Sequence, residues 1–409
     1  MKIAILTSGI LPVPATKGGA VENLTDFYLE YNNNHHLHDI TIYSVADKTA
    51  MHHPALQALV NHYVFIDVNS LKAKIAKRFF HVLHRKQEYY HYTIEYYLHE
   101  AIKHIKKQNF DVILIENRPA YALKLKRFTN AKIVYHLHNE KLHSNTFQCH
   151  EIYDSATLIL TVSDYIKSRV LSINPTDTKT RTIYNGINLA AFNSNYTSII
   201  TRKDLNLSSD DFVMLFSGRV TQEKGIMELI EAMNLLHDLP HIKLLVIGSS
   251  FYGNANNKND FAKALNDKAS PVRDRITFTG FIPYEQMPNY LQIADIAVIP
   301  SVWDDPFPTT VLEAEAMGLP IISTRRGGIP EEVTDECAIL LDTDENFIKN
   351  LAQTIRYLYE HPEKRKQMSI ASLERSKAFD KEMYAKNFFD ALESVQQCHQ
   401  IDNQASNRQ

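Results

Sequence analysis

The chain has 409 residues, 44% of them hydrophobic, which is long enough for two domains with separate cores. Its formal net charge of −3 gives no overall basic field for nucleic acid, and no apolar run of about 18 residues marks a membrane span. The chain begins with a buried-strand pattern and not with a signal peptide, and Cys149, Cys337 and Cys398 lack metal-ligand spacing. We therefore expect a protein of the reducing cytoplasm.

Short β-branched runs alternate with helical patterns in both halves of the chain, which predicts parallel sheets covered by helices. In the first half the expected strands are 2–7, 40–44, 64–67, 111–116, 132–137 and 158–162. In the second half they are 212–217, 242–248, 276–280, 296–299, 320–323 and 338–341. An Asn-Gly turn near 183–188 predicts the linker. We expect an N-terminal domain of 1–183, a C-terminal domain of 184–380, a last helix of 381–397 and a polar tail of 398–409.

A glycine pair lies in the long loop after the first expected strand. Gly18 and Gly19 allow the backbone to approach a bound group closely, and the helix that follows presents free N–H groups to an anion. Open α/β sheets bind ligands at the carboxyl ends of their strands, which favours a binding loop over a merely flexible one. Neither Gly9 nor Gly248 opens a Gly-x-Gly-x-x-Gly pattern, which argues against a dinucleotide-binding dehydrogenase.

Residues 71–86 predict a basic amphipathic helix without an acidic residue. Its apolar positions share one helical face and are Leu71, Ile75, Phe79, Val82 and Leu83. Such a helix can lie on an anionic membrane leaflet, or its apolar stripe can pack on the first sheet. Peripheral membrane contact and packing on the sheet therefore remain as alternatives.

A histidine pair ends the expected strand of 132–137. His138 faces the carboxyl edge of the sheet, and His136 lies on the same side because side chains alternate along a strand. The spacing places no third ligand beside the pair, so we expect no metal site there.

A basic pair follows the first strand of the second half and precedes a helical pattern at 226–236. Arg219 can bind two phosphate oxygens at once and Lys224 adds a mobile charge, so together they can neutralise a diphosphate without a metal. The alternative is an ordinary charged surface.

Two acids lie around a predicted helix start in the run from Pro300 to Gly318. Pro306 and Pro308 keep the loop extended, and the helical pattern begins near Thr310, so Asp305 and Glu313 flank an anion site. Free N–H groups and the helix dipole favour a phosphate at such a site, and each carboxylate can accept hydrogen bonds from paired hydroxyls. A sugar and a ribose joined by a diphosphate supply all three.

This run closely resembles the acid, seven residues, acid motif of glycosyltransferase family 4, the retaining nucleotide-sugar enzymes of GT-B fold. The resemblance covers nearly the whole chain and includes the glycine pair, the Arg219 and Lys224 pair and the Asn-Gly linker. It implies an α/β architecture in which two doubly wound, Rossmann-like domains face a central cleft. It also implies that the helix of 381–397 crosses back onto the first domain.

The resemblance assigns roles to individual residues. It places Asp305 at the donor sugar and Glu313 at the nucleotide ribose, although the first acid is usually Glu, and the shorter Asp puts the identity of the sugar in question. Pro308 stands where Gly is common and offers no N–H. The donors that remain at this helix start are Phe307, Thr309 and Thr310.

Three further assignments follow from the resemblance. Gly18 and Gly19 match a loop over the donor diphosphate, and His138 matches a site histidine that orients the sugar. Phe281 and Ile282 match the stretch that packs on the base, where apolar contact selects a pyrimidine. Ser301 and the Gly327-Gly328 turn are expected to support the loops.

We therefore expect a retaining glycosyltransferase of the hexosyltransferase type that uses a UDP-linked sugar and a carbohydrate or lipid-linked acceptor. The chain is similar to bacterial glycosyltransferases of spore coat, capsule and exopolysaccharide assembly, and we expect it in the cytoplasm or at the inner face of the membrane. No cofactor, metal or nucleic acid is expected. The alternatives are a GT-B nucleotide-sugar epimerase and a non-catalytic coat or scaffold protein that kept the fold.

Overall fold

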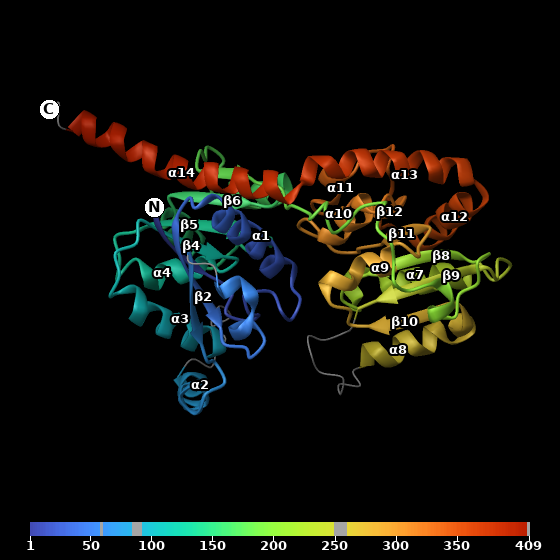
Figure 1. The fold of residues 1–409 in the computed structure, drawn as a ribbon, viewed down its shortest axis with the longest axis horizontal. Helices are drawn as coiled ribbons and strands as arrows, with labels where there is room; N and C mark the ends of the chain where they lie inside the picture. The colour runs from blue at the N-terminus through green and yellow to red at the C-terminus, as the bar shows by residue number, and fades with distance from the viewer. Residues whose placement is uncertain (58–59, 84–91, 249–259, 407–409) are drawn as a thin grey trace. The chain divides into compact units, whose positions relative to one another are not determined.

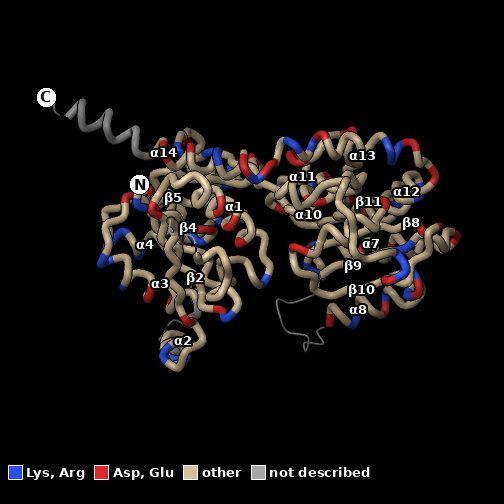
Figure 2. Tube along the Cα trace, in the orientation of Figure 1, with Lys and Arg blue, Asp and Glu red and all other residues tan. Residues whose placement is uncertain are grey.

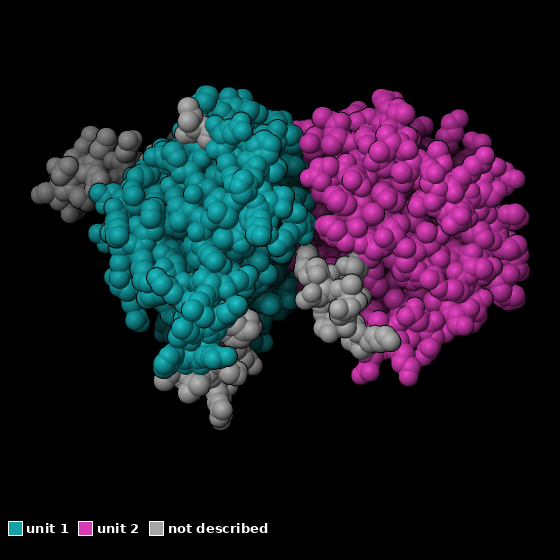
Figure 3. All heavy atoms as spheres, turned by 60° about the horizontal axis from the view of Figure 1, so that its bottom comes forward, with its two compact units in different colours: residues 1–186, 381–409 teal, residues 187–380 magenta. Residues whose placement is uncertain are grey.

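The computed structural model describes residues 1–57, 60–83, 92–248 and 260–406. The chain divides into two compact units, which are coloured separately in Figure 3. The first unit consists of residues 1–186 together with 381–409, and the second of residues 187–380. The division therefore falls after Gly186, slightly beyond the expected boundary at 183, and the C-terminal helix belongs to the first unit. We call these units the N-terminal and C-terminal domains.

The N-terminal domain is built on a parallel sheet of seven strands in the order β3-β2-β1-β4-β5-β6-β7 (Figure 1). The strands are β1 (Lys2–Leu6), β2 (Asp39–Val45), β3 (Asn61–Ile66), β4 (Val112–Glu116), β5 (Lys132–Leu137), β6 (Leu158–Thr161) and β7 (Thr180–Thr182). The helices are α1 (Ala20–His35), α2 (Leu71–Leu83), α3 (Tyr92–Ile105), α4 (Ala122–Leu125), α5 (Cys149–Asp154), α6 (Asp164–Leu171) and α14 (Lys381–Ser406). The near-continuous apolar runs of β1 and β4 suit a sheet that is covered on both faces.

One face of this sheet is covered by the first helix of the chain, α1, and by its last, α14. Leu24 and Tyr28 of α1 pack with Phe388 and Leu392 of α14 against sheet residues such as Ile5. The ring of Phe388 stacks on that of Tyr28 at a centroid distance of 4.2 Å. The chain therefore does return to its first domain, and α14 runs to Ser406, past the expected end at Gln397.

The C-terminal domain repeats this plan with a parallel sheet of six strands in the order β10-β9-β8-β11-β12-β13. The strands are β8 (Phe212–Ser217), β9 (Ile242–Ile247), β10 (Ile276–Gly280), β11 (Ile296–Ile299), β12 (Ile321–Thr324) and β13 (Ala338–Leu341). The helices are α7 (Ile226–Asn234), α8 (Asp260–Ala269), α9 (Met287–Leu291), α10 (Thr309–Ala316), α11 (Ile329–Glu332), α12 (Phe347–Glu360) and α13 (Pro362–Ser376). Its core joins α7 and α12 to the strands, with Leu229, Ile230 and Leu351 fully buried.

The strand order fixes where each domain can bind a ligand. In the first sheet β1 lies between β2 and β4, and in the second β8 lies between β9 and β11. From each central strand the chain first adds strands on one side of the sheet, and it then crosses over to add the remaining strands on the other side. The loops at the carboxyl ends of the two central strands therefore diverge, and such switch points are where open α/β sheets bind ligands.

Two further observations concern membranes and helix ends. Among the described residues, no helix combines the length and the apolar character that a membrane crossing requires. Helix α10 begins at Thr309, one position before the expected start, and follows Pro308, whose fixed φ suits a helix start.

Candidate active site

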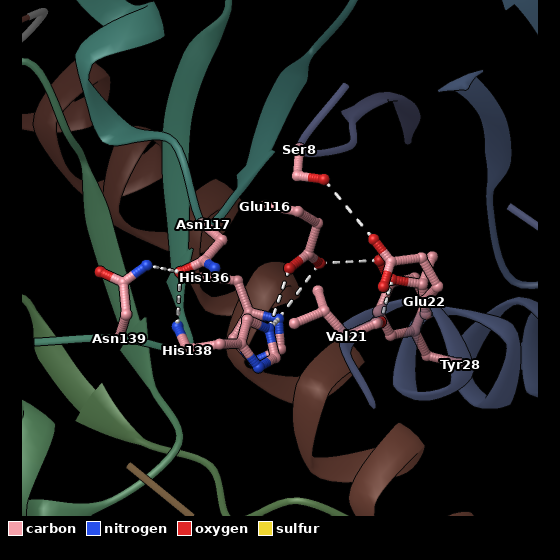
Figure 4. A network of polar contacts seen from close by, with 10 residues as sticks. Ser8, Val21, Glu22, Tyr28, Glu116, Asn117, His136, His138 and Asn139 are labelled. Carbon is pink, nitrogen blue, oxygen red and sulfur yellow. Dashed lines mark hydrogen bonds and ion pairs between the residues drawn. The ribbon is translucent and has the colours of Figure 1, made fainter. Parts of the chain in front are cut away.

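The switch point of the first sheet carries a buried polar cluster centred on Glu116, the last residue of β4 (Figure 4). His136 Nδ1 lies 3.1 Å from Glu116 Oε1, and His138 Nε2 lies 3.1 Å from Oε2. The hydroxyl of Tyr28 on α1 donates to Oε1 at 2.8 Å. Parallel pairing of β4 with β5 sets this arrangement, because it places Glu116 directly opposite His136.

The carboxyl group of Glu116 is ionised at neutral pH. Burial by itself favours the neutral acid, but the charge and hydrogen bonds of His136, together with the hydrogen bond from His138, outweigh it and hold the pKa of Glu116 well below its usual range. A buried carboxylate with two imidazole donors and a phenol donor is well satisfied. Glu116 is therefore a fixed carboxylate under the switch point, with the two histidines as its partners.

The same contact decides what His138 can do. Burial of its side chain and the neighbouring His136 lower the pKa of His138 to about 4, against the pull of Glu116, so the ring is neutral at pH 7. With Nε2–H donating to Glu116, the other ring nitrogen, Nδ1, carries the lone pair. His138 is therefore set to accept a hydrogen bond at Nδ1, and its backbone N–H is held by Asn117 Oδ1 at 3.1 Å.

The glycine loop lies over a second buried acid. Gly19 has φ +109°, which favours glycine, and its backbone comes so close to Glu22 that a Cβ there would stand 2.2 Å from Oε2. Burial raises the pKa of Glu22 to about 7, helped by the charges of Glu116 and Asp26. Protonation of Glu22, which this pKa allows near neutral pH, reduces the repulsion that an acid at this helix start would exert on a phosphate.

The histidine pair has a third possible metal ligand after all. One donor atom each from Glu116, His136 and His138 fall within 4.8 Å of one another, a set that would suit a divalent ion such as zinc. The sequence spacing could not show Glu116, because pairing of β4 and β5 brings it there. The hydrogen bonds among the three side chains already satisfy the carboxylate without an ion, so the absence of a metal remains our proposal.

The second switch point joins two of the predicted residues directly. The ammonium of Lys224 and the carboxylate of Asp305 form an ion pair in which both side chains are largely buried. Lys224 ends a 3-10 turn at Gln222–Lys224 after β8, and Asp305 lies in the loop after β11. Gly225 locks the two loops together, since a Cβ there would stand 1.8 Å from the carbonyl oxygen of Pro300.

Arg219 pairs with Glu223 and is half exposed. Its Nη2 lies 3.5 Å from Glu223 Oε1, and both side chains keep more than a third of their surface. A surface ion pair of this kind contributes little stability, so a phosphate can take the guanidinium from it at small cost. Beside Arg219, a Cβ on Gly218 would meet no atom of the described residues within 4 Å, so they leave open space at the end of β8.

Helix α10 carries Glu313 one turn into its length. Burial raises the pKa of Glu313 to about 8, partly opposed by a hydrogen bond from Thr309. The first N–H groups of a helix have no partner within it, and those of Thr309 and Thr310 are at this end. Phe307 is buried against Phe379 at a ring distance of 5.7 Å, so only its backbone is placed to serve a ligand.

A second buried acid stands behind the Lys224–Asp305 pair. Both carboxyl oxygens of Glu332 are buried without a hydrogen-bond partner. Burial, and then the charges of Asp305, Glu315 and Glu331, raise the pKa of Glu332 well above its usual range, which favours its protonated form. Gly328 N donates to the carbonyl of Asp305 at 2.8 Å, which holds this turn against the loop.

The remaining predicted residues and supports lie around the same loops. Phe281 follows β10 and is 55% exposed, which leaves its ring accessible, and Ile282 beside it is half-buried. Ser301 donates to the carbonyl of Glu223 at 3.3 Å, so it ties the two loops together as a support. A hollow of about 620 Å³ lies elsewhere, at the starts of β4 and β5, which is the edge opposite the switch point, and we assign it no role in catalysis.

Sequence reasoning missed Tyr28, Glu22, Glu116 and Glu332. Glu116 had a signal, since it is the polar last residue of an otherwise apolar strand beside the central one. Glu22 and Tyr28 reach the cluster only through the packing of α1 on the sheet, and Glu332 only through the turn of 327–332. No spacing rule predicts those contacts.

Known proteins resemble this chain in sequence. A family model described as glycosyl transferases group 1 matches residues 198–375. A putative glycosyltransferase of Bacillus subtilis (strain 168), YtcC, is 31% identical over 366 residues, which cover 87% of this chain and 82% of that protein. Spore coat protein SA of the same organism is 27% identical over 407 residues, 96% of this chain and 99% of its own length.

Solved structures resemble it in fold. HepE of Anabaena in complex with UDP and glucose has a TM-score of 0.73 at 20% identity, covering 96% of this chain and 100% of that one. Sucrose-phosphate synthase of Thermosynechococcus elongatus has a TM-score of 0.75 at 19% identity, covering 97% and 100%. At these identities the likeness establishes the fold, the two-domain GT-B architecture.

Proposed function

Because the chain belongs to the group 1 glycosyl transferases, we propose that it moves a hexose from UDP to an acceptor hydroxyl with retention of configuration. The observation that carries this proposal is the second switch point. There Lys224, Asp305 and the start of α10 lie together, with Glu313 buried in the first turns of the same helix. This combination offers cations and N–H groups to a diphosphate and carboxylates to hydroxyl pairs.

The nucleotide is held by the C-terminal domain in this proposal. Phe281 packs on the base, Glu313 accepts from the ribose hydroxyls, and the N–H groups of Phe307, Thr309 and Thr310 face the diphosphate. Arg219 and Lys224 neutralise the charge that builds up as the diphosphate leaves. Lys224 reaches the phosphate from its contact with Asp305. The single positive charge of Lys224 is therefore shared between the leaving diphosphate and the carboxylate that contacts the sugar.

In this proposal each domain contributes groups that recognise the sugar. Asp305 and the Nδ1 lone pair of His138 accept from its hydroxyls, and the Gly18-Gly19 loop faces the diphosphate. In a retaining transfer the acceptor hydroxyl attacks from the side on which the diphosphate departs. The new bond to the anomeric carbon forms as the bond to phosphate breaks, and the hydroxyl proton goes to the departing phosphate oxygen.

Names of relatives support the biological setting that we propose. Spore coat protein SA and a putative teichuronic acid glycosyltransferase, TuaC, both of Bacillus subtilis, are among them. HepE has been solved with UDP and with UDP-glucose, which supports uridine as the nucleotide. We propose that the product is a cell-surface polysaccharide or glycoconjugate.

The test is slow donor hydrolysis, which needs no acceptor. UDP-, GDP- and dTDP-sugars are incubated with the protein in EDTA, and released nucleoside diphosphate and the anomer of the free sugar are followed by NMR. We expect UDP release with the anomeric configuration of the donor, lost in Lys224→Ala. Release of the opposite anomer refutes retention, and a requirement for a divalent ion refutes the metal-free account.

The same assay separates the alternatives. An epimerase converts the sugar while it stays attached to UDP, so new sugar nucleotide appears without free UDP. A scaffold that kept the fold binds UDP but releases nothing from any donor, even with cell-wall extract as acceptor. Either result overturns the proposal.

A further inference from the structure

Helix α2 exposes an apolar stripe to solvent. The exposed fractions of Leu71, Ile75 and Phe79 are 75%, 50% and 68%. Residues spaced by four lie on one side of a helix, so these side chains form a continuous row along about two turns. Isolated apolar residues are common on protein surfaces, but a continuous row marks an interaction site.

The opposite side of α2 is the one that packs on the domain. Ala73 is fully buried, and Ala76, Lys77 and Phe80 are half-buried, which is the spacing of a single helical face turned inward toward α3. Of the two alternatives, packing of the stripe on the sheet is therefore excluded for Leu71, Ile75 and Phe79. The side chains of Val82 and Leu83 and residues 84–86 lie outside the described part of the chain.

Basic residues border the stripe. Lys72, Lys74 and Arg78 are exposed, and α2 contains no acid, as its colouring in Figure 2 shows. On the neighbouring helix α3, Glu95 pairs with Lys124 and Glu100 pairs with Lys103, so these acids do not cancel the basic border. By helical rotation, Lys72 and Lys74 fall on either side of the row of apolar residues.

We propose that α2 docks the N-terminal domain on an anionic lipid surface. An interfacial helix buries an apolar row in the acyl boundary while basic side chains on its borders meet anionic headgroups. The apolar row, its basic border and the lack of acids fit that surface. A protein partner is the less favoured occupant, because the row is narrow and borders only positive charge.

Docking through α2 gives the transferase a direction. The helix follows β3 after a short connection at 67–70, at the carboxyl end of the sheet. That is the edge at which β4 and β5 present Glu116 and His138. If the proposed transferase holds, the acceptor that fits is one anchored in the same leaflet, a hydroxyl on a lipid-linked carrier. This last step rests on the proposed function, whereas the docking does not.

The experiment is co-sedimentation of the full chain with two kinds of vesicle. One is phosphatidylcholine alone, and the other contains about 30% phosphatidylglycerol, which makes its surface anionic. We expect binding to the anionic vesicles only, weakened at high salt. Leu71→Ser with Phe79→Ser tests the apolar row, and Lys74→Gln with Arg78→Gln tests the border. Each basic residue is worth about a fivefold change in partitioning, so the second pair should lower it about 25-fold.

Matched controls lie on the other domain. Ile370 is 64% exposed, and Lys349 and Lys366 are exposed, so Ile370→Ser makes one exposed apolar-to-serine change elsewhere and Lys349→Gln with Lys366→Gln makes both lysine changes. These variants should sediment like the parent. UDP release from the donor in solution should be unchanged in all variants, because none touches the proposed site, and this separates failure of docking from failure of the transferase.

Three outcomes would overturn the proposal. They are absence of sedimentation by the parent, equal loss in the controls and the α2 variants, and equal binding to neutral vesicles. Concentration-dependent dimers that Leu71→Ser with Phe79→Ser abolishes, without vesicle binding by the parent, would assign the row to a second copy of this chain instead.

Discussion

Glu313 is an acid that burial keeps partly protonated before a nucleotide binds, since its pKa is raised to about 8. If the ribose hydroxyls donate to its ionised form, binding must first remove the proton below pH 8. We predict that UDP affinity of the parent falls by up to about tenfold per pH unit below 8, relative to Glu313→Gln. Titration calorimetry of both proteins from pH 6 to pH 8.5 measures the difference.

At pH 8.5 the same substitution should weaken UDP binding about 10- to 100-fold, because a charged acceptor is lost. Glu315→Gln is the matched control. Glu315 lies two positions along α10 and contacts Cys337 Sγ at 3.5 Å, so it should leave UDP affinity unchanged. Unaltered affinity in a folded Glu313→Gln variant would remove this residue from the ribose site.

His138 and His136 contact the same carboxylate, but substitutions of the two residues should have different effects. We predict that His138→Ala lowers sugar transfer about 10- to 100-fold, since it removes an acceptor of the sugar hydroxyls, and leaves UDP affinity intact. His136 is fully buried, so His136→Ala should chiefly lower the free energy of unfolding, by about 1–3 kcal/mol, as Glu116 loses a donor. Donor turnover, UDP calorimetry and denaturant unfolding together measure these effects.

A reversal, with His136 needed for turnover at unchanged stability and His138 dispensable, would contradict the site assignment in β5. The sequence identified both histidines from alternation along one strand. Alternation alone could not tell them apart, and only the family resemblance pointed to His138. The full burial of His136 depends on packing with α14, whose Phe388 ring lies 5.4 Å from that of His136.

At the scale of elements, most strands could be predicted from the sequence because buried parallel strands are short apolar runs. The bounds of β5, β8, β10, β11 and β13 agree with the expected ones. β7 was missed, since Thr180–Thr182 is short and polar and is held by pairing with β6. The residues of the second switch point could be predicted from local motifs, whereas the carboxylate at the first depends on pairing between strands.

The contact of α11 with the loop after β11 predicts a pH dependence of stability. Glu332 on α11 faces Asp305, Glu315 and Glu331, with Lys224 opposing them, and its folded-state pKa lies well above the unfolded value. The contribution of Glu332 to the free energy of unfolding is therefore fully present below its unfolded-state pKa. It is lost as the pH rises toward its folded-state pKa. Relative to the parent, Glu332→Gln should gain up to about 1.4 kcal/mol of unfolding free energy per pH unit over that window.

Urea unfolding of both proteins at pH 4.5, 6 and 7.5, about the window in which a free Glu has lost its proton, measures this slope. The quantity of interest is the change with pH, since replacing the carboxyl group also shifts stability by a constant amount. A difference that does not depend on pH would mean that Glu332 is ionised in the folded protein and has partners that neutralise it.

At the scale of the whole molecule, the N-terminal domain is discontinuous in sequence. Its core contains Tyr384, Phe388 and Val395 from α14 beside residues of β1 and α1, whereas the C-terminal domain is formed by residues 187–380 alone. The prediction is that a chain ending at Asp380 loses the cooperative unfolding of the first domain and all sugar transfer, but still binds UDP. Differential scanning calorimetry and UDP titration test this.

A chain ending at Gln397 is the matched control, because Val395 is the last residue of that core among those whose side chains the structure describes. This shortened chain should keep sugar transfer, UDP binding and the cooperative unfolding of the first domain. If the chain ending at Asp380 still transferred sugar, α14 would be a cover and not a part of the fold of the first domain.

The return of α14 also sets an order on synthesis. The first sheet leaves the ribosome early, yet the ring that stacks on Tyr28 is made almost last. The C-terminal domain, which lies in the middle of the chain, can therefore fold before the N-terminal domain is complete. This is the reverse of the usual order, in which the N-terminal domain folds first during synthesis. Since Tyr28 in turn donates to Glu116, the first switch point is completed only on a finished chain. We therefore expect a prematurely terminated product to bind the nucleotide without transferring sugar.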